Sequence, residues 1–153
     1  MKQRGFTILE LLIAMAVLSV GILGIMNLMI TAVSSVGGTK DRVVAANLAQ
    51  EGAEIALGIR NTNWIAGDAY DDGLEAGTWC ADASDQVLTA CATHTVQWDG
   101  AFYTHGIGED TDFSRRVVIA PGSDGTNSFL RVQSIVEWNG QSITAETHLY
   151  DWR

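Results

Sequence analysis

The chain has 153 residues, of which 47% are hydrophobic and 18% charged, and its formal net charge is −9. This length suffices for one compact domain with an extended anchor and is too short for two ordinary domains. Between Arg60 and Arg115 there is no lysine or arginine, so this acidic stretch repels phosphate backbones and disfavours sequence-independent nucleic-acid binding. A solvated acidic surface is the main interpretation, with cation binding as the alternative.

The first predicted element is an apolar helix over residues 6–30. In this run of roughly 25 residues the only charged residue is Glu10, and at ~1.5 Å per residue the helix spans a bilayer. Lys2 and Arg4 precede it, which keeps that end in the cytoplasm and exports the rest of the chain. The run exceeds the apolar region of about 7–15 residues in a secretory signal, although Ala32-Val33-Ser34 could serve as a cleavage site.

Glu10 is the unusual residue of this helix. A carboxylate in an apolar membrane span costs about 2–3 kcal/mol and marks a candidate functional site that needs a cationic partner. The alternatives are a carboxyl group that is protonated in lipid or one that reaches the nearby membrane interface.

The six residues Gly5-Phe6-Thr7-Ile8-Leu9-Glu10, after a short basic leader, resemble the prepilin signature of type IV pilins and type II secretion pseudopilins. The resemblance implies a leader of residues 1–5 that a prepilin peptidase removes between Gly5 and Phe6, followed by methylation of the Phe6 amine. It also implies that Glu10, with Thr7, sets subunit register, because Glu10 pairs with the N-terminal ammonium of a neighbouring subunit.

Two glycines interrupt the apolar helix, Gly21 and Gly24, and the chain's one proline, Pro121, lies far downstream. Each glycine weakens a helix by roughly 1 kcal/mol relative to alanine. The glycines either give the helix flexibility or form a small-residue packing face, and the sequence leaves both interpretations open.

Residues 31–60 are expected to continue the helix as an amphipathic segment. Residues 34–38 interrupt the apolar pattern, so we expect a hinge there, with Thr39 or Asp41 capping a new start. After the hinge, the residues of one helical face recur at intervals of 4, 4, 3 and 4 positions. This face should cover the globular domain, while the opposite face is exposed to water. The covering residues are Val44, Leu48, Gly52, Ile55 and Ile59, and the water-facing ones are Glu51, Glu54 and Arg60.

Residues 61–112 are expected to form a loop-rich acidic region. Turn signals occur at 67–68, 72–73 and 99–100, and one short strand is predicted at 93–98. Cys80 and Cys91 lie on the exported side, so we expect a disulfide that stabilises the domain by roughly 2–3 kcal/mol. Four acidic residues are weak calcium candidates because they supply hard oxygen ligands, although their spacing is not that of an EF-hand: Asp68, Asp71, Asp72 and Glu75.

Residues 113–153 are predicted to form an antiparallel sheet. A strand at 113–120 is followed by an expected Pro121-Gly122 turn and by a hairpin with Asn139-Gly140 at its two-residue turn. This register opposes Trp138 with Gln141, Val136 with Ile143, Ser134 with Ala145, Val132 with Thr147, and Leu130 with Leu149. The opposite face of the hairpin is polar, so one face of the sheet should be exposed to solvent. The five tryptophans, at 64, 79, 98, 138 and 152, are interpreted as core and sheet packing.

The predicted fold is therefore α+β, a long N-terminal helix packed on an antiparallel sheet of about four strands. No phosphate loop, metal-spaced histidine pair or nucleophile motif is present in the sequence, which argues against an enzyme.

The resemblance implies a filament subunit that waits in the inner membrane and then joins a pilus or periplasmic filament. Its partners would be other subunits, the prepilin peptidase, an assembly platform and the lipid bilayer. Ala49-Gln50-Glu51-Gly52 before the segment Arg60 to Trp64, and the closing segment Thr147 to Trp152, resemble minor pilins and favour a pilin over a pseudopilin. A calcium-dependent membrane-anchored adhesin and an exported hydrolase are the alternatives from other classes.

Overall fold

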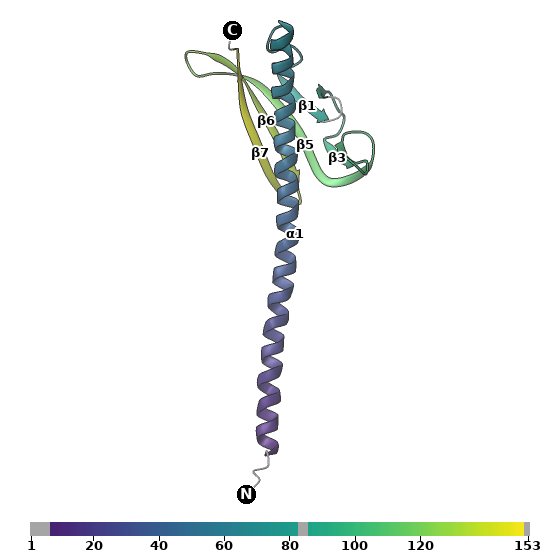
Figure 1. Ribbon diagram of the computed structural model, residues 1–153, viewed down its shortest axis with the longest axis vertical. Helices are drawn as coiled ribbons and strands as arrows, with labels where there is room; N and C mark the ends of the chain where they lie inside the picture. The colour runs from purple at the N-terminus through teal and green to yellow at the C-terminus, as the bar shows by residue number, and fades with distance from the viewer. Residues whose placement is uncertain (1–6, 83–85, 152–153) are drawn as a thin grey trace. The chain divides into compact units, whose positions relative to one another are not determined.

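The computed structural model describes residues 7–82 and 86–151, which include the long helix α1 (Ile8–Ala66) and seven strands (Figure 1). The chain divides into two units, Met1–Lys40 and Asp41–Arg153. The first consists of the N-terminal part of α1, and the second contains the rest of α1 with the sheet. An α+β fold with an apolar N-terminal helix and an antiparallel sheet is thus confirmed.

The helix α1 does not break where the sequence predicted a new start. Residues 34–38 are helical, and Thr39 and Asp41 lie within the helix instead of capping one. Gly37 and Gly38 each weaken a helix by only about 1 kcal/mol, which flanking helical turns can outweigh. The boundary between the two units nevertheless follows Lys40, close to the predicted hinge.

The C-terminal end of α1 lies at Ala66, later than the predicted end at residue 60. Gly67 has a φ of 85°, which is the left-handed conformation that ends helices, and the Asp68 amide donates to the Asn63 carbonyl at 3.0 Å. The Asn63 side chain also donates to the Asp72 carbonyl at 2.7 Å and so secures the chain after the helix. The turn signal at 67–68 therefore marks the helix end.

The sheet is antiparallel, and its long central strand is β5 (Glu109–Ser123). One edge of β5 pairs with β6 (Ser128–Trp138), which pairs with β7 (Gln141–Tyr150). The other edge pairs first with β3 (Thr95–Trp98) and then with β1 (Gly77–Asp82). Two short strands, β2 (Val87–Thr89) and β4 (Tyr103–Thr104), extend β1 and β3 respectively.

The seven strands exceed the four that we expected, because the acidic region contributes β1 to β4. These strands have two to six residues, and such short segments contain too few alternations to be distinguished from loops in a sequence. The strand predicted at 93–98 corresponds to β3.

The β6–β7 hairpin has the predicted register, from Trp138 opposite Gln141 to Leu130 opposite Leu149. Asn139 and Gly140 have φ values of 45° and 73°, as a type I′ turn requires. The predicted Pro121-Gly122 turn is wrong, since both residues belong to β5. Pro121 is tolerated because β1 pairs with β5 at residues 117–119, so position 121 needs no donor on that edge. The chain reverses instead at Asp124, whose carboxylate accepts from the amides of Thr126 and Asn127.

The core of the second unit lies between α1 and one face of the sheet (Figure 1). Gly52 of α1 faces Ser134 of β6, and a Cβ at Gly52 would overlap the Ser134 hydroxyl and crowd Val117. The predicted apolar helix face is the buried one. The buried apolar residues are Ala45, Leu48, Ala49, Ile55 and Ala56 from the helix, with Leu74, Ala81, Val96, Val117, Ile119, Val132, Val136, Trp138 and Leu149.

The tryptophans divide between core and surface. Trp138 is buried and Trp79 packs against the core, as predicted. Trp64 is exposed, which corrects the interpretation for this residue, whereas Trp98 is 40% exposed and packs against Tyr103 of the neighbouring strand. Trp152 lies outside the described residues.

Candidate functional site

The first turn of α1 contains both residues assigned to subunit register. Thr7 caps the helix, because its Oγ1 accepts a hydrogen bond of 3.3 Å from the Glu10 amide. Thr7 and Glu10 therefore occupy the N-cap and third positions of the helix, and a carboxylate in the first turn interacts favourably with the helix dipole. The Glu10 side chain is exposed within the single chain. Gly5 and Phe6, the predicted cleavage and methylation residues, lie outside the described residues.

The apolar residues that follow are exposed along the N-terminal part of α1. Large side chains from Ile8 to Val33 are more than half exposed, and the most apolar window of the helix is 0% buried. By length and composition alone, this helix is sufficient to cross a membrane. Such a surface requires either lipid or other protein to cover it.

Gly21 and Gly24 lie inside this exposed part of α1. The helix is continuous through both, and a Cβ added at either would have no atom within 4 Å. The flexibility and the packing interpretations of these glycines both remain predictions.

A buried arginine ties α1 to the sheet in the second unit. Arg115 of β5 is fully buried, and its Nη1 donates to Glu51 Oε1 at 2.9 Å and to the Leu48 carbonyl at 3.4 Å. Its Nη2 donates to the Ala81 carbonyl of β1. The expectation that Glu51 simply faces water is therefore wrong, whereas Glu54 is exposed as predicted.

The alternation of inward and outward side chains along β5 could have predicted this ion pair from the sequence. In β5, residues 113, 115, 117 and 119 share a face, and Val117 and Ile119 are clearly core residues. Arg115 must therefore point inward, and a buried guanidinium needs an acceptor from the element packed above it. Glu51 is the acidic residue that the helix places there.

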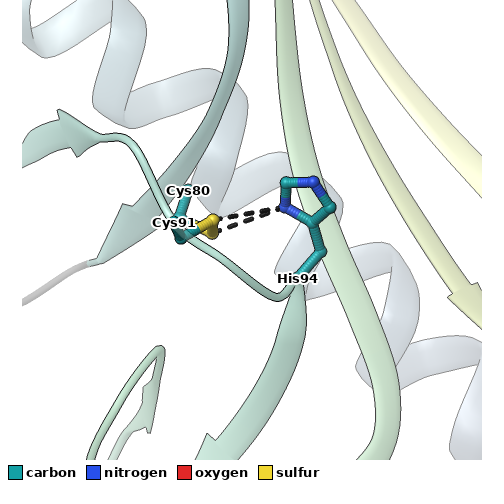
Figure 2. A group of neighbouring side chains, drawn as sticks. All are labelled: Cys80, Cys91 and His94. Atoms are coloured by element: carbon teal, nitrogen blue, oxygen red, sulfur yellow. Dashed lines mark hydrogen bonds between the residues drawn. A yellow bond between two sulfur atoms is a disulfide. The ribbon is translucent and has the colours of Figure 1, made fainter.

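The predicted disulfide joins Cys80 of β1 to Cys91, which lies between β2 and β3, with their Cα atoms 5.9 Å apart. His94 Nδ1 lies 3.3 Å from Cys91 Sγ and 3.5 Å from Cys80 Sγ (Figure 2). These three residues form the group within residues 7–82 and 86–151 whose ligand atoms lie close enough together to hold a metal. The two sulfurs are bonded to each other, so the thiolates that a zinc site needs are not available.

The calcium candidates lie in the connection between α1 and β1. Asp68, Asp71, Asp72 and Glu75 are exposed, and no three of them in this described segment bring their carboxylates within 4.8 Å of one another. Calcium binding by these residues remains a prediction.

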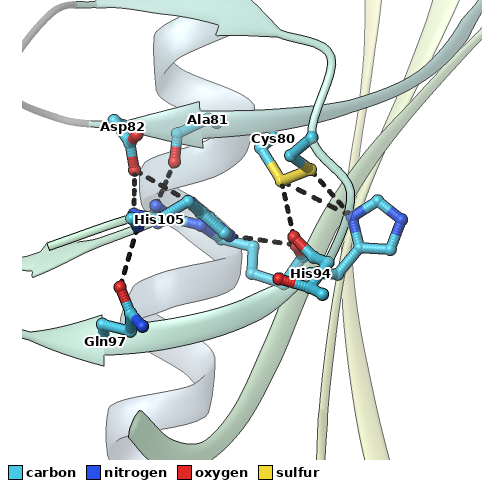
Figure 3. The surroundings of a disulfide bond; sticks show 10 residues. Cys80, Ala81, Asp82, His94, Gln97 and His105 are labelled. Carbon is cyan, nitrogen blue, oxygen red and sulfur yellow. Dashed lines mark hydrogen bonds and ion pairs between the residues drawn. A yellow bond between two sulfur atoms is a disulfide. The ribbon is translucent and has the colours of Figure 1, made fainter. Parts of the chain in front are cut away.

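The histidines occupy three separate environments. His94 lies at the disulfide, and His148 lies 3.0 Å from Glu146 on the exposed face of β7. His105 Nδ1 lies 2.9 Å from Asp82 Oδ1, and its Nε2 lies 3.3 Å from the Arg115 carbonyl (Figure 3). The His105 contacts connect the segment after β4 to β1 and β5, so they brace the fold.

The architecture is thus a capped, exposed apolar helix that continues into a disulfide-bonded antiparallel sheet domain, as in a membrane-anchored assembly subunit. Residues 1–26 match the family model described as the prokaryotic N-terminal methylation motif, the prepilin-type signature. This match supports a pilin- or pseudopilin-type subunit and indicates a structural role. Neither the comparison with curated proteins nor that with solved structures gave a match.

Proposed function

We propose that this chain is a minor subunit of a type IV pilus or pilus-like filament. The observation that carries the proposal is the helix of the methylation-motif match, whose large apolar side chains are exposed from Ile8 to Val33. In a membrane, lipid covers this surface, and in a filament the helices of neighbouring subunits cover it. Assembly therefore replaces lipid contacts with protein contacts.

Processing and assembly follow from the first turn of the helix. A prepilin peptidase cuts between Gly5 and Phe6 and methylates the new amine, and the helix then remains as the anchor. The new ammonium lies next to a helix N-terminus, which repels positive charge. A carboxylate from the Glu10 of a neighbouring subunit relieves that repulsion, and each buried charge is tolerable only when matched.

The subunit occupies two locations in succession. Before assembly it spans the inner membrane once, with the disulfide-bonded domain exported, as the positive residues Lys2 and Arg4 direct. An assembly platform with its own energy source then moves it into the filament. The resemblance of residues 49–52 and 60–64 to minor pilins favours a pilus over a secretion pseudopilus.

Mass spectrometry of the mature N-terminus tests the processing step. We expect the mature protein to begin at methylated Phe6. A mature chain that still begins at Met1, or one cut after Ser34, would contradict the proposal. An intact Met1 would instead favour a membrane-anchored adhesin that does not polymerise.

Substitution of Glu10 tests the assembly step. Glu10→Ala and Glu10→Gln should both be processed and folded but lost from purified filaments, because each removes the carboxylate. Thr7→Ala removes only the helix cap, worth about 1 kcal/mol, and should reduce incorporation less. If Thr7→Ala and Glu10→Gln reduced incorporation equally, capping and not pairing between subunits would explain the role of Glu10.

A further inference from the structure

Three large apolar side chains are exposed at the end of β3 and in the segments that connect β3 to β4 and β4 to β5. Trp98 is 40% exposed, Phe102 is 62% exposed and Ile107 is 78% exposed. Trp98 and Ile107 line one shallow groove together with Gly100 and Gly108. We call the groove surface of Trp98 and Ile107, together with the adjoining turn that carries Phe102, the Trp98 face. Exposed apolar groups of this kind mark interaction sites more often than isolated apolar residues do.

Phe102 is held outward by a hydrogen-bonded turn. The Asp99 carboxylate accepts from the Ala101 and Phe102 amides at 2.7 Å each, and the Asp99 amide donates to the Phe102 carbonyl at 3.2 Å. Gly100 supplies the positive φ of 101° that the turn requires. The exposed ring therefore sits on a fixed backbone.

Ile107 is held outward in the same way by its neighbours. Its carbonyl accepts from Thr104 Oγ1 at 2.7 Å, and the Gly106 amide donates to the Gln97 side chain at 2.9 Å. The His105 amide and ring both contact Asp82 of β1 (Figure 3). Polar bonds thus fix the loop while its apolar side chain remains uncovered, and a pre-organised side chain loses less entropy on binding.

The Trp98 face is continuous with the core through a row of aromatic rings. Ring centroids are 4.9 Å apart between Trp98 and Tyr103, 6.5 Å between Tyr103 and Phe113, and 6.4 Å between Phe113 and buried Trp138. Such pairs stabilise the aromatic row beyond simple area burial. The face is therefore a rigid extension of the folded domain.

The charge around the Trp98 face limits what can bind it. Asp99 and Glu109 line the groove, and Asp110, next to Glu109 on β5, is exposed. Backbone hydrogen bonds from Phe102 and Ala101 lower the pKa of Asp99, so this carboxylate stays charged at neutral pH. No lysine or arginine lies between residues 60 and 115. Anionic lipid and nucleic acid are therefore repelled.

A second copy of this chain is also a poor partner. Within the described part of the chain, the exposed lysine and arginine side chains are Lys40, Arg42 and Arg131. Asp41 lies between the first two in sequence, and Arg131 interacts electrostatically with Glu146. The copy would also bring its own excess of acidic residues, since the full chain has 18 Asp and Glu against 9 Lys and Arg. Within residues 7–82 and 86–151, the copy offers no basic surface to match the carboxylates of the Trp98 face.

We propose that the Trp98 face docks a different filament subunit, through an apolar side chain surrounded by lysine or arginine. This inference rests on the proposed function, because it requires the chain to enter a filament of more than one kind of subunit. The exposed apolar side chains, held on a rigid backbone, supply the affinity, and the carboxylates around them favour a partner with basic residues.

Photo-crosslinking in assembled filaments tests the proposal. The full chain carries p-benzoylphenylalanine in place of Phe102, which preserves an exposed aromatic ring. A control chain carries it in place of Trp64, which is 43% exposed near the C-terminal end of α1. Irradiated filaments are purified, and the crosslinked peptides are identified by mass spectrometry. We expect the Phe102 probe, and not the Trp64 probe, to join a different subunit at an apolar site flanked by basic residues.

Charge reversal supplies the second measurement. The variant Glu109→Lys, which reverses a charge in the groove, should reduce the yield of the Phe102 crosslink several-fold, whereas the exposed control Glu54→Lys should leave it unchanged. A Phe102 crosslink to another copy of this chain, a crosslink to lipid alone, or no crosslink from incorporated protein would overturn the proposal. A chain that lacks methylated Phe6 or never enters filaments would instead refute the proposed function on which it rests.

Discussion

The two parts of α1 have similar side chains in opposite environments. From Ile8 to Val33, leucine, isoleucine, valine and methionine are exposed, whereas Leu48 and Ile55 are buried against the sheet. Within the described residues, the chain thus supplies a partner for one part of its helix and not for the other. The comparison teaches that helix composition alone does not distinguish a core helix from an assembly helix.

Packing density differs between the two parts as well. At Gly52 the sheet approaches so closely that no Cβ fits, whereas Gly21 and Gly24 have open space around them. The same residue type therefore allows close contact in one part and leaves the helix surface unfilled in the other. Variants that affect one part without the other can separate folding from assembly.

The largest effect is expected from Arg115→Ala. This change leaves the Glu51 carboxylate and the Ala81 carbonyl without their buried donor, and it should lower the free energy of unfolding by about 3–5 kcal/mol. Guanidinium unfolding of the full chain in detergent, followed by tryptophan fluorescence, measures the loss. Arg116→Ala is the matched control, because Arg116 pairs with Glu137 on the exposed face and should cost less than about 1 kcal/mol. Equal losses for the two variants would show that the buried ion pair does not hold the helix on the sheet.

A smaller effect is expected from Gly52→Ala. The new methyl group would overlap Ser134, so the domain should lose about 1–3 kcal/mol of unfolding free energy. Gly21→Ala with Gly24→Ala is the comparison, since alanine meets nothing there and favours the helix by up to about 1 kcal/mol per site. This second variant should therefore unfold normally. Any loss of filament incorporation would then come from neighbouring subunits or from lost flexibility, and stability loss at 21 and 24 would contradict the comparison.

The smallest effect concerns acidic pH. Hydrogen bonding to Arg116 lowers the pKa of Glu137, and hydrogen bonding to Gln133 and His148 lowers the pKa of Glu146. Their contribution to stability is present above the unfolded-state pKa and is lost as pH falls through the lower folded-state pKa. Thermal unfolding should therefore shift down by a few degrees from pH 7 to pH 3. The shift should shrink in Glu137→Gln with Glu146→Gln, and an unchanged shift would assign it to other groups.

The sequence alone predicted those features that depend on residues close to one another in the chain. Alternation around Asn139-Gly140 determined the whole β6–β7 register, and helical periodicity identified the face that contains Leu48 and Ile55. Cysteines on an exported chain indicated the disulfide. In each case, neighbouring positions carried the information.

The missed features depend on distant parts of the chain. Glu51 looked solvated because its partner, Arg115, lies 64 residues away. Pro121 looked like a turn because its tolerance depends on where β1 stops pairing with β5. The Trp98 face combines a turn, a loop and a strand end, so no local pattern marks Trp98, Phe102 and Ile107 as one surface.

In the loop around Ile107, the residues that stabilise the domain differ from the residue whose side chain is exposed. Its hydrogen bonds use the backbone and the side chains of Thr104, His105 and Gln97, while the Ile107 side chain supports nothing beneath it. A substitution at position 107 should therefore change the surface that the loop presents while the free energy of unfolding stays the same.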